Sequence, residues 1–245
     1  MLEGFRDCHS HLLPGVDDGA RKPEEAKDKL RLLRSQGAAT AILTPHVNSA
    51  FGDRTLTKEE LRRRFSSLKE ACEKEPGSYP VLKLGCEYYL DPYSKDSIDP
   101  ITMAGSDVVM LELPYSIGLA GVIRAVNVAR GQGYRVLLAH PEKYYAFQAQ
   151  WDKALEFLRS SPDVFVQVET WDVGKHNDDT HSVCSWRFIE SRTATVVGTD
   201  SHGCHRPPSY DRAVAALTEW AGEDPERRDY TERLLRLNAQ EIFFS

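Results

Sequence analysis

The stretch Val136-Leu137-Leu138-Ala139-His140-Pro141-Glu142-Lys143 decides the fold class, because an unbroken apolar run ends directly in polar residues. Such a run is typical of a strand buried on both faces, as in a parallel sheet. Val108-Val109-Met110-Leu111, followed by Glu112, repeats the pattern. Because parallel strands are joined by crossover helices, we expect an α/β protein.

Apolar runs alternate with helical patterns along the whole chain. We predict strands at residues 4–8, 39–44, 81–86, 107–113, 134–139, 164–168 and 194–198. The first helix is expected to begin at Pro23 and to stop at Gly37, and further helices are predicted at residues 58–72, 119–131, 151–159 and 210–221. About seven βα units predict either a closed barrel or an open doubly wound sheet, and periodicity does not distinguish them.

Length and composition favour one domain spanning residues 1–245. The chain is 41% hydrophobic, which suffices for a substantial core, and a length near 250 residues suits a single α/β barrel. It contains no apolar signal core and no 18-residue apolar run, so we expect a cytoplasmic protein without membrane insertion. The oligomeric state stays open.

Charge and cysteine usage exclude some functions. The net charge is −6 with no basic run, which argues against nucleic-acid binding. The five cysteines form no CxxC pair, so a disulfide framework is not expected. None is followed by the Cys-x5-Arg phosphate loop of cysteine phosphatases. We interpret Cys8, Cys86 and Cys204 as small buried hydrophobic residues.

Potential metal ligands follow the predicted strands, at the end where α/β folds place their active sites. In an extended segment, residues i and i+2 project to one side, so His9 and His11 can reach one ion. Asp200 and His202 share this spacing. The full candidate set is His9, His11, Asp18, His46, Glu87, Glu112, His140, Asp200 and His202.

Each candidate also has an ordinary structural explanation. The His-x-His pair is more often incidental than functional, residues 200–202 could cap a helix, and Glu112 could be a hydrogen-bonded buried acid. Together, however, four clustered carboxylates would repel one another unless cations balanced them. Three divalent ions would leave the site electrophilic, and ligands without thiolate suit Zn, Mn or Fe. His176 and His181 are expected in a solvated loop, and His205 stays open.

The stretch from Asp7 to Ala20 resembles the opening signature of one branch of the polymerase and histidinol phosphatase (PHP) family. That branch comprises the bacterial manganese-dependent protein-tyrosine phosphatases that regulate capsule and exopolysaccharide synthesis. The resemblance continues motif by motif to residues 200–202, and residues 238–243 are similar to the family's final helix. It implies a distorted (β/α)7 barrel with three metal ions, Mn first and Fe or Zn as alternatives.

The resemblance also implies how the ligands divide. His9, His11, Glu87 and Asp200 would hold the first ion, Glu87 with Glu112 and His140 the second, and Asp18, His46 and His202 the third. The family has arginine directly after His-Pro-Glu, where this chain has Lys143, and Arg206 lies near a second phosphate-binding arginine. Lysine keeps the charge but loses the bidentate fork. Residues 170–184 also depart from the family's pattern.

The activity implied is direct hydrolysis of a phosphomonoester by a metal-activated water, with Arg206 and Lys143 neutralising the phosphate. The implied substrate is a phosphotyrosine protein, such as a membrane-associated tyrosine kinase. Three alternatives stay open: a phosphatase for a small metabolite such as histidinol phosphate, a nuclease-like phosphodiesterase, and a non-catalytic metal-binding regulatory module. Asp18 argues against the metabolite enzyme, since histidinol phosphatases of the family usually carry another residue there.

Overall fold

The computed structural model describes residues 4–52, 56–175, 179–203 and 206–244, and within them every strand pairing in the sheets is parallel. The strands form two ladders, β1-β2-β4 and β3-β5-β6-β7-β8-β9. Their bounds are β1 (Phe5–Asp7), β2 (Ala38–Leu43), β3 (His46–Val47), β4 (Val81–Leu84), β5 (Glu87–Tyr89), β6 (Val108–Glu112), β7 (Arg135–Leu138), β8 (Val164–Glu169) and β9 (Val196–Gly198).

The two ladders are continuous through backbone hydrogen bonds. The N–H of Gly85 donates to the carbonyl of Leu43 (2.9 Å), and the N–H of Glu87 donates to that of Pro45 (3.1 Å). β3 and β5 therefore prolong β2 and β4 beyond short interruptions, one of which contains a proline that cannot donate to a ladder. The seven predicted strands are confirmed, but the extensions β3 and β5 were not predicted.

The first and last strands also meet. The N–H of Asp200 donates to the carbonyl of His9 (2.8 Å), and the N–H of His11 donates to that of Ser201 (2.9 Å). Below them, the buried Asp7 carboxylate accepts hydrogen bonds from the backbone N–H (2.8 Å) and hydroxyl (2.7 Å) of Thr199. These contacts close the sheet on itself, so the structure is a distorted α/β barrel and not an open doubly wound sheet.

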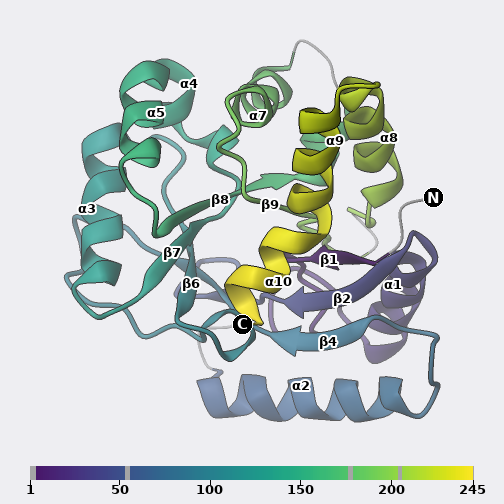
Figure 1. Cartoon of the computed structure of the whole chain (residues 1–245). Helices are drawn as coiled ribbons and strands as arrows, with labels where there is room; N and C mark the ends of the chain where they lie inside the picture. Colours follow the sequence, from purple (N-terminus) through teal and green to yellow (C-terminus); the bar gives the residue numbers. More distant parts are fainter. Residues whose placement is uncertain (1–3, 53–55, 176–178, 204–205, 245) are drawn as a thin grey trace.

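Helices surround the strands (Figure 1). Those predicted at 58–72, 119–131, 151–159 and 210–221 are present, and the first runs from Pro23 to Ser35 with Ala26, Leu30 and Leu33 buried. The helices are α1 (Pro23–Ser35), α2 (Lys58–Glu73), α3 (Leu119–Arg130), α4 (Tyr145–Ala149), α5 (Trp151–Arg159), α6 (Thr170–Lys175), α7 (Thr180–Glu190), α8 (Tyr210–Ala221), α9 (Pro225–Glu232) and α10 (Asn238–Phe243), with short turns η1 (Met103–Gly105), η2 (Pro141–Lys143) and η3 (Arg233–Leu237).

The C-terminal helix α10 packs against residues of the strands, where Figure 1 shows it in yellow near β1 and β2. Ile242 and Phe243 belong to one buried cluster with side chains such as Ile42, Met110 and Leu137. These strand residues precede the candidate ligands along the chain. The polar end of the barrel is thus left for the site, while this cluster fills the interior below it mainly with apolar side chains.

The structure corrects the expected loop around residue 180 and confirms the burial of Cys8 and Cys86. The polar segment around residue 180 is not all loop: His181 lies in the first turn of α7, capped by the Asp179 carboxylate, which accepts from the His181 N–H (2.9 Å). Cys8 and Cys86 are free and buried, as are the other two described cysteines. The predictions for His176, Cys204 and His205 lie outside the described residues.

Within the described ranges, no helix combines the length and apolarity that crossing a bilayer requires.

Candidate metal centre

All nine predicted ligands lie at the C-terminal end of the barrel. His46 and Glu87 begin the extensions β3 and β5, Glu112 ends β6, and the others lie in the segments that follow β1, β7 and β9. Seven of the nine side chains are buried, His202 is half-buried and Asp18 is exposed. The parallel arrangement brings them together because every strand ends at the same rim. Their ligand atoms form overlapping groups, in which His140 joins His9 and Glu87 while Glu112 joins His46 and Glu87.

In the first group, four ligand atoms converge: His9 Nε2, His11 Nε2, Glu87 Oε2 and Asp200 Oδ1. The two imidazole nitrogens are 3.1 Å apart. They lie 3.5 and 3.3 Å from the Glu87 oxygen and 3.4 and 3.2 Å from the Asp200 oxygen. Ligands about 2.0–2.2 Å from one ion are roughly 2.8–3.6 Å from one another in tetrahedral or octahedral geometry. The spacing therefore fits a single transition-metal ion.

The second group shares the Glu87 carboxylate. Its Oε1 lies 2.8 Å from His140 Nε2, while Glu112 Oε2 lies 3.9 Å from His46 Nδ1. Three carboxylate oxygens of the first two groups are buried without a hydrogen-bond partner among the described residues, namely Glu87 Oε2, Glu112 Oε2 and Asp200 Oδ1. Buried carboxylate oxygens are normally satisfied, and a cation would satisfy all three.

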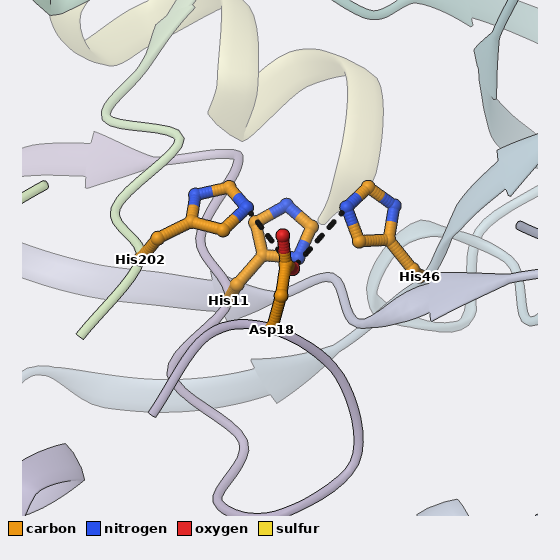
Figure 2. A group of neighbouring side chains, drawn as sticks. All are labelled: His11, Asp18, His46 and His202. Carbon is orange, nitrogen blue, oxygen red and sulfur yellow. Dashed lines mark ion pairs between the residues drawn. The ribbon is translucent and has the colours of Figure 1, made fainter. Parts of the chain in front are cut away.

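The third group surrounds Asp18 (Figure 2). Asp18 Oδ1 lies 3.6 Å from His46 Nε2 and 3.4 Å from His202 Nε2. The His11 ring packs beside both histidines, with ring centroids 4.3 Å from His46 and 4.1 Å from His202. His46 stands between two groups, because its Nδ1 is 3.0 Å from Glu87 Oε2 while its Nε2 faces Asp18.

Hydrogen bonds orient the imidazole rings. His9 Nδ1 donates to Gln167 Oε1 (2.9 Å), and His11 Nδ1 donates to Asp17 Oδ2 (3.0 Å). His202 Nδ1 donates to the carbonyl of Asp200 (2.8 Å). In each ring Nε2 is left with its lone pair directed into the centre, which is the arrangement that metal-binding histidines adopt.

The electrostatics of the groups also favour a cation. Burial lowers the pKa of His9, but the Glu87 and Asp200 carboxylates outweigh it and raise the pKa to about 9. Burial, reinforced by the Glu87 charge, raises the pKa of Glu112 to about 8. The carboxylates thus attract positive charge into a buried space. A divalent ion supplies that charge while leaving the imidazoles neutral, as ligation requires.

Two ligands occupy strained backbone conformations. His140 has φ 33° and Asp200 has φ 47°, in the left-handed region that residues with a Cβ seldom adopt. Such strain costs about 1–3 kcal/mol per residue and persists only where the surroundings enforce it. Here it turns two side chains inward just after β7 and β9.

A cationic flank lies beside the first group. Lys143 contacts the buried Glu169 carboxylate and lies 3.6 Å from Asp200 Oδ2. Arg206 contacts Asp200 and lies 3.6 Å from Glu169 Oε1. The structure thus brings both predicted phosphate-binding residues to the centre, where each is engaged by an internal carboxylate.

Glu169 was not predicted from the sequence. It is the last residue of β8, whereas the predicted strand ended one residue earlier, so the sixth strand contributed no polar candidate. The other candidates were selected as polar side chains at strand ends. A predicted strand that ended at residue 169 would have made Glu169 a candidate by the same rule. The orienting residues Asp17 and Gln167 were also missed, since no spacing pattern marks them.

The donor set fits the metals that the sequence favours. It combines imidazole nitrogens with carboxylate oxygens and includes no thiolate, as Mn, Fe or Zn centres can. Cys86 is fully buried, and burial raises the pKa of its thiol to about 12. A thiol so rarely ionised is a poor ligand and a poor nucleophile.

Known proteins match this sequence along most of its length. The family model described as "Capsular polysaccharide synthesis, CpsB/CapC" matches residues 5–244. Tyrosine-protein phosphatase CpsB of Streptococcus pneumoniae is 23% identical over 228 residues, covering 88% of this chain and 90% of the relative. The corresponding CpsB of Streptococcus agalactiae serotype V is 24% identical over 245 residues, covering 96% and 97%.

Solved structures agree on the fold. A chain from the study of YwqE of Bacillus subtilis and CpsB of Streptococcus pneumoniae, described as metal-dependent tyrosine phosphatases, superposes with a TM-score of 0.78 at 20% identity, covering 97% of this chain and 94% of the other. The phosphotriesterase of Mycobacterium tuberculosis superposes with a TM-score of 0.58 at 12% identity, covering 98% and 94%. Because the family model spans nearly the whole sequence, this chain is a member of the CpsB/CapC family of capsular polysaccharide synthesis proteins.

Proposed function

We propose that this protein is a metal-dependent phosphatase that hydrolyses phosphotyrosine in a protein substrate. The observation that carries the proposal is the convergence of His9, His11, Glu87 and Asp200, whose ligand atoms lie 3.1–3.5 Å apart in the pairs measured. The relatives that align along nearly the whole chain are named tyrosine-protein phosphatases, which supports phosphotyrosine as the substrate.

The proposed centre holds three ions, with manganese as the first choice. One ion would be held by the four residues above, a second by Glu87, Glu112 and His140, and a third by Asp18, His46 and His202. Bound ions of this kind lower the pKa of a coordinated water and neutralise phosphate charge. The Glu87 carboxylate, which faces histidines with both oxygens, is suited to bridge two of them.

The chain's own residues orient the centre and receive the substrate. Gln167 and Asp17 fix the tautomers of His9 and His11, so their lone pairs point inward. Lys143 and Arg206 supply positive charge at its edge, which a dianionic phosphate entering a protein of net charge −6 requires. We propose that both residues contact phosphate oxygens in the transition state, where charge is spread over these atoms.

A phosphotyrosine substrate is chemically suited to such a site. The phenolate leaving group departs more readily than an alkoxide, so an unassisted departure is feasible. We further propose that the protein substrate is a bacterial tyrosine kinase of capsule or exopolysaccharide synthesis, in keeping with the family to which the chain belongs. A small metabolite such as histidinol phosphate is the second candidate, and Asp18 argues against it.

The test is phosphate release from a phosphotyrosine peptide by the parent protein, after chelation and again after adding Mn. We expect activity that disappears with the chelator and returns with the metal. Glu87→Ala should abolish turnover and lower the metal content, while His181→Ala, a histidine in α7 outside the centre, should change neither. Full activity in Glu87→Ala would exclude the proposed bridge. A folded, metal-loaded parent that releases no phosphate would favour the metabolite enzyme or the regulatory module.

A further inference from the structure

Exposed aromatic side chains gather at one end of the barrel. All of the large aromatic residues that are strongly exposed within the described part of the chain follow the C-terminal ends of strands, on the segments after β3, β5, β6, β7 and β8. They are Phe51, Tyr93, Tyr115, Tyr145 and Trp171. Exposed apolar surface concentrated on one face is typical of a binding surface.

Two of these rings lie directly against candidate metal ligands. Phe51 is 60% exposed, and its ring centroid is 5.6 Å from that of His46. Tyr115 is 50% exposed and meets His140 edge-on, with the centroids 6.0 Å apart. The Lys143 ammonium also lies 6.0 Å from the Tyr115 ring centroid. Each ring therefore contacts a candidate ligand and is still at least half exposed.

Each of the two rings contacts a histidine that faces the Glu87 carboxylate. His46 Nδ1 is 3.0 Å from one oxygen of the Glu87 carboxylate, and His140 Nε2 is 2.8 Å from the other. Phe51 and Tyr115 thus contact His46 and His140, which face different oxygens of the Glu87 carboxylate. A phosphate ester bound at this centre would carry its ester group toward solvent, where both rings are exposed.

We propose that Phe51 and Tyr115 are specificity-determining residues that hold the aromatic ring of the substrate. The inference rests on the proposed phosphatase function and concerns its preference for aryl over alkyl phosphates. Ring pairs with centroids 4.5–7 Å apart attract one another beyond the burial of their area, which corresponds to a factor of roughly 2–10 in affinity for each pair. Two such contacts select a phenyl ester by binding, independently of how readily its leaving group departs.

Binding of unreactive analogues separates this recognition from the chemistry. Benzylphosphonate presents a phenyl ring and a phosphonate that cannot be hydrolysed, and methylphosphonate lacks the ring. We would measure both affinities by titration calorimetry on the Mn-loaded parent and on Phe51→Ala, Tyr115→Ala and the double variant. Tyr93→Ala is the matched control, because Tyr93 is 71% exposed on the same rim and none of the ring contacts measured in the described residues joins it to a candidate ligand.

The parent should bind benzylphosphonate more tightly, and the double variant should lose roughly 4- to 100-fold of this preference. Methylphosphonate affinity and metal content should not change, and Tyr115→Phe should retain the preference because it keeps the ring. An unchanged preference in the double variant would overturn the proposal. A parallel loss of both affinities together with metal would also overturn it, since the rings would then only shield the ligands from water.

These measurements separate a failure of the aromatic-site proposal from a failure of the proposed phosphatase function. A parent that prefers benzylphosphonate through these rings but releases no phosphate from phosphotyrosine would refute the activity and keep the aromatic site. A parent that hydrolyses phosphotyrosine while the double variant keeps the full preference would support the activity and refute the role of Phe51 and Tyr115.

Discussion

Substitution of Gly19 tests how tightly the loop after β1 holds the third group of ligands. A Cβ at position 19 would lie 2.0 Å from the carbonyl oxygen of His11 and 2.5 Å from its Cβ. A carbon atom ordinarily stays about 3.3 Å from such an oxygen, so Gly19→Ala must move the loop by about 1 Å. The N–H of Ala20 donates to this same carbonyl (2.9 Å), which leaves little room for the shift.

The displacement acts on the neighbouring acids. Asp18 belongs to the third ligand group, and Asp17 orients His11. A misplacement of about 1 Å can cost roughly 100-fold in rate, equivalent to about 2.7 kcal/mol of transition-state stabilisation. We therefore expect Gly19→Ala to lower kcat/KM on a phosphotyrosine peptide about 100-fold and to reduce the bound metal.

The assay combines phosphate release with metal analysis and circular dichroism. Gly118→Ala is the control, because residue 118 has φ −85° and its added Cβ would approach only Gln150 Oε1, at 3.7 Å. This variant should match the parent. If Gly19→Ala were folded and kept the parent's activity and metal content, the close approach would not position the ligands and the reasoning would be refuted.

Three further measurements address the centre and its surroundings. Asp17→Asn should weaken Mn binding 10- to 100-fold, because the Asp17 carboxylate accepts the Nδ1 proton of His11, and an unchanged affinity by calorimetry would contradict that role. Chelation should lower Tm and Mn should restore it, since an ion at 100 times its Kd stabilises the fold by about 2.7 kcal/mol; equal scanning-calorimetry traces would argue against a metal site. Iodoacetamide should leave Cys86 unmodified in the native protein, as burial raises its pKa to about 12, and peptide mapping that showed alkylation with loss of turnover would instead indicate a nucleophilic cysteine.

Strand positions and the candidate ligands could be predicted from the sequence because both depend on local pattern. The apolar run 136–139 indicates a buried strand, and His140 follows this strand directly in the sequence, independently of the tertiary structure. In a parallel barrel each such residue reaches the same rim, so strand ends identify neighbours in space. The charge of four carboxylates then indicates cations before any distance is known.

The interactions that orient the ligands could not be predicted in this way, because they join distant parts of the chain. His9 and Gln167 are 158 positions apart, and the hydrogen bond between them depends on how β1 and β8 are placed by barrel closure. The engagement of Lys143 by Glu169 likewise depends on the packing of β8 beside the segment after β7. Periodicity carries no information about such pairs.

The sequence by itself determined the fold class, the strand order along the chain and the identity of the candidate ligands, since these follow from hydrophobic pattern and residue chemistry. The family resemblance implied a closed barrel, and the tertiary structure shows how the sheet closes, through the hydrogen bonds from Asp200 N–H to His9 and from His11 N–H to Ser201. Only the tertiary structure decided that ligand atoms meet at 3.1–3.5 Å and that Phe51 and Tyr115 flank them. The physical reason is that closure is a property of all seven strands together, whereas each pattern describes only one.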